Sequence, residues 1–265
     1  MNYIVFDLEF NQGYNFSKET NTINPMCPFE IIQIGAVKLD EHFDTIGTLD
    51  VLVKPEIYTS LNPFVKELTG ITMDELDSGN SFKEMYDKLL EFIGTDKNVL
   101  CVWGLADIKE LFRNIKYYNF DKTMIPTEYI NIQSYASTSF NCKKGINIGL
   151  GNAATLLNIP IEIQFHNALN DAYYTAEIFK KIYSKDIKTK IYYPDKLKNP
   201  NRSLNQNYKI DTLNLMNQFE KMFNRKMSKD ERSIIKLAYI MGKTNQFQIK
   251  TPCDLIPNIP TTQKK

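Results

Sequence analysis

The chain opens with MNYIVFDLEF (residues 1–10), an apolar run that contains two acidic side chains, Asp7 and Glu9. Its β-branched and aromatic residues, followed by a polar stretch, predict a first strand over residues 3–8. Positions two apart on a strand point to the same face, so both carboxylates project together. A divalent cation would offset their repulsion and the cost of burying them. The alternative is two ordinary acids at an exposed strand end.

The composition is that of a globular protein, with 43% apolar and 24% charged residues among 265. Thirty-two Lys+Arg against 31 Asp+Glu leave a formal charge of +1, so any polyanionic partner must be bound in a local groove. The four cysteines form no Cys-x-x-Cys pair and predict reduced thiols rather than a zinc site. The chain shows neither a signal peptide nor a membrane-spanning run, so we expect a cytoplasmic protein.

Hydrophobic periodicity predicts an α/β fold in which a mixed β-sheet is flanked by helices. Two strands, over residues 31–39 and 48–53, follow the first and suggest an antiparallel meander with short connections. A wholly apolar run at residues 99–103 predicts a buried central strand. A loop is expected at residues 141–149, and helices over residues 64–68, 82–93, 107–118, 151–157 and 170–183.

The composition shifts near residue 191, where turn-forming residues predict a linker. We therefore expect a first domain over residues 1–190, a linker over 191–205, and a small helical appendage over 206–265. An apolar stripe at residues 215–223 and a capping box formed by Ser228 and Glu231 predict a helical hairpin. Residues 206–242 could bind a protein partner or self-associate, and the last dozen residues are expected to be irregular.

Three more candidate residues lie where helices begin. Asp107 opens a helix directly after the apolar strand, although it could simply be an N-cap. His166 lies in a polar connection, and Asp171 starts the next helix. An imidazole with a pKa near neutrality can deprotonate water, but a lone loop histidine often has no such role. His42, the other histidine, is interpreted as a surface residue.

Taken in order, residues 6–10, Asp107 after its strand, and His166-x4-Asp171 resemble the three motifs of the DEDDh 3′→5′ exonucleases. The stretch EIIQIGAV (residues 30–37) is similar to the family's second-strand pattern EIIEIGAV, and the resemblance covers about residues 1–185. The stretch LTGIT at residues 68–72, and the Trp-Gly pair before Asp107, look most like the branch of histone-mRNA and RNA-interference exonucleases and their sporulation-inhibitor-type bacterial relatives. Proofreading subunits and ribonuclease T are more distant likenesses.

The resemblance implies a ribonuclease H-like fold and a role for each motif residue. The metal-ligand carboxylates match Asp7, Glu9, Asp107 and Asp171, and the general base matches His166. The implied cofactors are two divalent cations, Mg²⁺ or Mn²⁺, since all-oxygen ligands favour hard ions. The implied activity is release of nucleoside 5′-monophosphates from 3′ ends of single-stranded RNA or DNA, with RNA favoured by the branch resemblance.

Six residues are candidates for substrate contacts: Phe10, Asn11, Leu68, Trp103, Lys143 and Lys144. They would contact the last base, the 3′-hydroxyl or the backbone phosphates. Four of them have an alternative, which is a core role for Leu68 and Trp103 and a solvated loop for the lysine pair. Two other functions stay open for the chain. One is a DNA-directed proofreading or repair exonuclease, and the other is a non-catalytic nucleic-acid-binding regulatory module.

Overall fold

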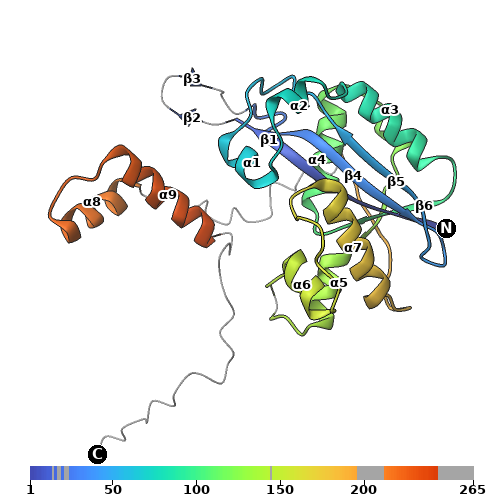
Figure 1. Cartoon of the computed structure of the whole chain (residues 1–265). Coiled ribbons are helices and arrows are strands. Elements are labelled where there is room, and N and C mark those ends of the chain that lie inside the picture. The colour runs from blue at the N-terminus through green and yellow to red at the C-terminus, as the bar shows by residue number, and fades with distance from the viewer. Residues whose placement is uncertain (14, 17–18, 21–23, 144, 196–211, 244–265) are drawn as a thin grey trace, which may run out of the picture. The chain divides into compact units, whose positions relative to one another are not determined.

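The computed structural model describes residues 1–13, 15–16, 19–20, 24–143, 145–195 and 212–243 (Figure 1). The chain divides into two compact units, Met1–Leu197 and Lys198–Lys265. Lys144, Cys253, residues 196–205 of the expected linker and the expected irregular tail lie outside the described residues. No helix in the described part of the chain is long and apolar enough to cross a membrane.

The first unit is built on a mixed six-stranded sheet with the strand order β5-β4-β1-β6-β7-β8. Near its centre, β1 (Asn2–Gln12) pairs antiparallel with β4 (Phe29–Leu39) and parallel with β6 (Asn98–Val102). β5 (Thr45–Leu52) completes the predicted antiparallel meander. The connection from β1 to β4 is longer than expected and contains a small pair of strands, β2 (Asn15–Phe16) and β3 (Glu19–Thr20).

The far side of the sheet contains elements that the hydrophobic pattern did not predict. β7 (Glu128–Asn131) runs parallel to β6, β8 (Lys190–Ile191) pairs antiparallel with β7, and α5 (Ile132–Ser139) follows β7 directly. β7 has four residues, of which Ile130 is buried and the other three are half-buried. Such a short strand with one buried residue gives no alternating apolar pattern. In α5 the hydroxyls of Ser137 and Thr138 donate to carbonyls one turn earlier, a local bonding habit that makes Ser and Thr weak helix formers.

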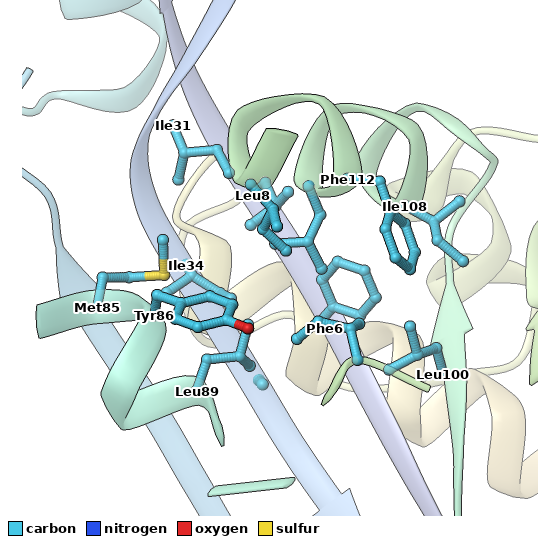
Figure 2. Close-up of a cluster of buried hydrophobic side chains, with 14 of the residues drawn as sticks. Phe6, Leu8, Ile31, Ile34, Met85, Tyr86, Leu89, Leu100, Ile108 and Phe112 are labelled. Carbon is cyan, nitrogen blue, oxygen red and sulfur yellow. The ribbon is translucent and has the colours of Figure 1, made fainter. Parts of the chain in front are cut away.

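Two hydrophobic cores form on opposite faces of the sheet because side chains alternate along β1. Ile4, Phe6 and Leu8 belong to a cluster with α3 (Phe82–Ile93) and α4 (Ala106–Tyr117), which Figure 2 shows. Tyr3 and Val5 belong to the opposite cluster with α5, α6 (Leu150–Leu156) and α7 (Ala168–Ile182). Figure 1 shows α4 and α7 on the two faces. Asp7 and Glu9 continue the second series and therefore face α7.

Capping residues determine where several of the helices begin and end. α1 (Pro63–Thr69) is capped by Asn62 and stops at Gly70, whose φ of 75° suits glycine. α2 (Met73–Asp77) and α3 each start with a capping box, and a short 3₁₀ turn, η1 (Lys122–Met124), precedes β7. α7 begins at Ala168, two residues before the predicted start, because the Asn167 side chain accepts a hydrogen bond from the Asn170 amide and caps it.

The first turn of α7 lies directly on β4. A Cβ atom added to Gly35 would lie 2.0 Å from the amide nitrogen of Leu169 and 2.1 Å from the carbonyl carbon of Ala168. Beside it, the buried Gln33 side chain accepts a hydrogen bond from the Ala168 amide at 3.1 Å and donates one to Asp50 at 2.8 Å. The absent side chain at Gly35 therefore sets how closely α7 approaches the sheet.

The second unit contains the two predicted helices, α8 (Thr212–Phe223) and α9 (Lys229–Lys243). The expected capping box is present: Ser228 N–H donates to the Glu231 carboxylate at 2.8 Å, and Glu231 N–H donates to Ser228 Oγ at 3.2 Å. Among its described side chains, the buried hydrophobic ones are Met216 and Met227. The hairpin has little core of its own.

We predict that Gly35→Ala destabilises the protein by about 3 kcal/mol, because the new methyl group forces backbone apart rather than a flexible side chain. Urea unfolding measures the change. Gly151→Ala in α6 is the matched control, since its Cβ would meet the Phe165 ring at 3.4 Å, an ordinary contact. An unfolding midpoint for Gly35→Ala equal to that of the wild type would contradict this account of the α7 contact.

Candidate active site

Asp7 and Glu9 lie on β1 under the first turn of α7. On the neighbouring strand Asp7 pairs with Gly35 and Glu9 pairs with Gln33, and a bulge follows Glu9. The contact of α7 with Gly35 therefore brings the beginning of that helix over the two carboxylates. Asp171 lies in the first turn of α7 and is 9% exposed.

Asp107 reaches the same place from α4. β6 runs parallel to β1, with Cys101 level with Val5, and ends at the next residue. The chain then turns through Gly104, whose φ is 105°, into α4. Asp107 lies in the first turn of this helix and is buried, whereas the N-cap position is held by Leu105 without a side-chain bond. The N-cap alternative for Asp107 is wrong.

His166 completes the group from the loop before α7. Its backbone is left-handed, with φ of 64°, and its main-chain N–H donates to Asp171 Oδ2 at 3.2 Å. One ligand atom each of Glu9, His166 and Asp171 lie within 4.8 Å of one another. The second Asp171 oxygen, Oδ1, is buried and has no hydrogen-bond partner in the described part of the chain. A buried oxygen of this kind is free to bind a cation.

Burial raises the pKa of every carboxyl group in the cluster, and repulsion from neighbouring acids raises the pKa of Asp7, Glu9 and Asp107 further. Burial is the largest cause in each case. It raises the pKa of Asp171 to about 6. Together with the charges of the other acids, it raises the pKa of Asp107 to about 7 and that of Glu9 to about 8. The pKa of Asp7 lies well above its usual range because of burial and then the charges of Asp107, Glu9 and Asp171. Main-chain hydrogen bonding from Leu8 partly opposes this rise for Asp7 and Asp107.

The metal-free site therefore holds protons at neutral pH that a cation would displace. Four carboxylates and one imidazole are the donor set of this cluster, and oxygen donors of this kind fit hard divalent cations. Partial burial lowers the pKa of the His166 imidazole, although the residue is exposed at the surface, so the ring is neutral and able to accept a proton at pH 7.

Two substrate candidates on β1 have different settings. Phe10 is half-buried, with its ring centroid 6.1 Å from that of Phe29. The Asn11 side chain is fully buried and bonded within the fold: its amide donates to the carbonyls of Tyr58 and Ser60, and its oxygen accepts from Asn62 N–H. A substrate contact by Asn11 therefore falls to its main chain.

The remaining candidates lie on other elements. Leu68 is half-buried on α1, and Lys143 is exposed in the loop before α6. The described contacts link neither of them to the carboxylate cluster. Trp103 packs against the hydrophobic cluster that includes α7. Its indole N–H is buried without a partner among the described residues, which favours the core alternative over base stacking. His42 is exposed, as expected.

Sequence reasoning missed two positioning residues. Gln33 connects α7 to β4 through its hydrogen bond with the Ala168 amide. Glu30, which is 1% exposed, accepts hydrogen bonds from the amides of residues 56–58 and from the Tyr118 hydroxyl, and so anchors the loop that leads to α1. Both lie in the quoted EIIQIGAV stretch, but their partners are far away in the sequence.

We predict that Glu9→Gln stabilises the metal-free protein at pH 8 by on the order of 2 kcal/mol, after a discount for partial exposure. Since the folded-state pKa of Glu9 is raised to about 8, the folded state binds more protons than the unfolded one above pH 4.5, and stability falls as pH rises towards 8. Urea unfolding in EDTA at pH 5 and pH 8 measures this. The exposed Glu67→Gln is the control, and an equal effect of both variants would contradict the prediction.

Comparison with known proteins matches the exonuclease (RNase_T) family model to residues 4–179. Human 3′-5′ exoribonuclease 1 is 30% identical over 115 residues, which cover 43% of this chain and 29% of that protein. DNA polymerase III PolC-type of Clostridium perfringens is 28% identical over 184 residues, 69% of this chain and 11% of the polymerase. The chain thus spans less than a third of the length of these relatives.

The solved structures agree on the fold. The nuclease domain of 3′hExo, a DEDDh family member bound to rAMP, superposes with a TM-score of 0.60 at 23% identity, covering 72% of this chain and 96% of that one. The predicted ribonuclease H-like fold is confirmed. Exonucleases of this family generally use two divalent metal ions. Because the family model covers about two thirds of its length, the chain belongs to the exonuclease (RNase_T) family.

Proposed function

We propose that this protein is a metal-dependent 3′→5′ exonuclease that releases nucleoside 5′-monophosphates from single-stranded nucleic acid, with RNA as the favoured substrate. The observation that carries the proposal is the meeting of four carboxylates and one imidazole from β1, α4, α7 and the preceding loop at one place. The preference for RNA is supported by the exoribonucleases among the relatives. We expect this activity in the cytoplasm, where the buried Cys27 and Cys101 remain reduced thiols.

Asp7, Glu9, Asp107 and Asp171 hold two divalent cations, Mg²⁺ or Mn²⁺, in place of the protons that they bind in the metal-free state. When bound, the cations supply Lewis-acid chemistry that acidifies water and neutralises charge on the scissile phosphate. His166 takes the proton of the attacking water as general base. Its loop position exposes the ring to the solvent, while the bond from its own N–H to Asp171 keeps the loop against the site.

The terminal nucleotide is bound by the segment after Glu9. The main-chain amide of Phe10 or of Asn11 holds the 3′-hydroxyl, and the side chains of Phe10 and Leu68 pack against the last base. Lys143 and Lys144 contact backbone phosphates. The exposed position of Lys143 supports this role, and the half-buried setting of Phe10 and Leu68 leaves part of each side chain free for the base.

We predict that the protein shortens 5′-labelled single-stranded RNA from its 3′ end with Mg²⁺ or Mn²⁺ and leaves it intact in EDTA. Asp7→Ala should lower the rate at least about 1,000-fold, because one carboxylate fewer leaves the cation charge uncompensated. A denaturing gel with RNA and DNA, single- and double-stranded, measures this. Faster digestion of DNA would favour the repair alternative. Intact oligonucleotides together with unimpaired binding would favour a non-catalytic module.

We predict that His166→Gln lowers kcat by about 100- to 10,000-fold, the range of general acid–base catalysis, while leaving Mn²⁺ binding unchanged. Calorimetric titration with Mn²⁺ gives the number of ions, and single-turnover digestion gives the rate. The exposed His42→Gln is the matched control. Loss of one bound ion in His166→Gln would identify the imidazole as a ligand instead of a base, since it lies within reach of the same ion as Glu9 and Asp171.

A further inference from the structure

Charge is divided unevenly between the two compact units. Residues 1–197 carry 19 Lys+Arg and 26 Asp+Glu, a net charge of −7, whereas residues 198–265 carry 13 and 5, a net charge of +8. The formal charge of +1 for the whole chain conceals this division. An acidic unit repels a polyanion at long range, so tight binding of nucleic acid requires cations from elsewhere.

The described part of the basic unit presents unpaired cations where α8 turns into α9. Two of its acids are neutralised within the hairpin: Glu220 accepts from Arg232 at 2.7 Å, and Glu231 accepts from Arg225 at 2.5 Å. Lys221 and Lys226, in contrast, are exposed. Neither has an ion-pair partner among the residues that the structure describes.

An open hollow of about 640 Å³ lies at this end of the hairpin. It is lined by Lys221, Lys226 and three amide side chains, with Glu220 and Arg225 completing the wall; the amides are Asn217, Gln218 and Asn224. Lysines neutralise backbone phosphates, and amide groups both donate to and accept from bases and sugars. This combination suits nucleic acid better than an acidic protein surface, which offers mainly acceptors.

An exposed aromatic ring lies next to the hollow. Phe223 is 57% exposed and stacks on Phe219, with ring centroids 6.5 Å apart and planes 8° apart. The Arg225 guanidinium lies 6.0 Å from the Phe223 ring centroid. Exposed aromatic rings beside cations are the usual platform for unpaired bases, because every base can stack on them.

We propose that the C-terminal unit is a single-stranded nucleic-acid-binding module, and that the hollow at the α8–α9 turn is its binding site. It captures the strand that the acidic exonuclease unit degrades; this second clause rests on the proposed function, whereas the binding itself does not. The proposal gives residues 206–242 a nucleic-acid partner instead of the protein partner or second copy that the sequence also allows.

The test uses the whole 265-residue chain in EDTA, where the proposed cleavage is absent, and fluorescence anisotropy with a labelled poly(U) oligonucleotide. Lys221→Gln with Lys226→Gln should weaken binding about tenfold and lower the slope of log affinity against log salt by about 1.4, or about 0.7 for each phosphate contact. Phe223→Ser should weaken binding about tenfold through lost stacking. Lys229→Gln with Lys236→Gln, which removes the same charge outside the hollow, should change affinity less than about twofold.

Circular dichroism checks that each variant keeps its helices. Equal loss of affinity in the control pair would mean that net charge alone attracts the strand, and would overturn the proposed site. Tighter binding to phosphatidylserine vesicles than to poly(U), or a Phe223→Ser variant that loses self-association in sedimentation but keeps RNA binding, would overturn it as well.

Digestion with Mn²⁺ separates this proposal from the exonuclease proposal. We expect the Lys221→Gln, Lys226→Gln variant to raise KM for long RNA about tenfold, with kcat unchanged. A dinucleotide should be cleaved as by the wild type, because its single phosphodiester group lies at the exonuclease site and leaves no further phosphate for the lysines. Cleavage of long RNA with unchanged KM and affinity would refute the binding module alone. Binding without cleavage in the wild type would refute the exonuclease proposal alone.

Discussion

The close contact between β4 and the first turn of α7 determines how the rest of the site is arranged. Gly35 has no side chain, so the backbone of Ala168 and Leu169 can lie against the strand, and Gln33 bonds to the Ala168 amide. Asp7 and Glu9 are the neighbours of these two residues on β1. A larger residue at Gly35 would lift α7, and with it Asp171, away from the acids of the sheet.

The contact has an electrostatic consequence. It places four carboxylates where burial raises the pKa of each, and mutual repulsion adds to the rise for Asp7, Glu9 and Asp107, so the fold without cations retains protons there. Burying these acids lowers the folding stability relative to a fold in which they stay solvated. Cation binding can restore that stability. Asp171 Oδ1, which is buried without a hydrogen-bond partner among the described residues, is one oxygen that a cation could bind. Proteins commonly carry such local costs at functional sites.

Much of the site could be predicted because its signals are local. Asp7 and Glu9 share a face because side chains alternate along a strand. Asp107 and Asp171 each lie in the first turn of a helix that the spacing of apolar residues predicts. The short, weakly patterned β7 and the Ser/Thr-rich α5 could not be recognised, since their stability comes from packing against β6 and α7. Asn11 was expected near the substrate, but its side chain bonds to a loop about fifty residues away.

The amino-acid sequence by itself determined the α/β class, the order of the acidic motifs and the uneven division of charge, because these depend on composition and short-range spacing. Only the tertiary structure decided which groups meet. The bond from Gln33 to Ala168 spans 135 residues, and the Glu30 carboxylate reaches the Tyr118 hydroxyl across 88. Such partners depend on the paths of whole strands and helices through space. No local pattern encodes those paths, so the depth of the carboxylates and their pKa values could be read only from the folded chain.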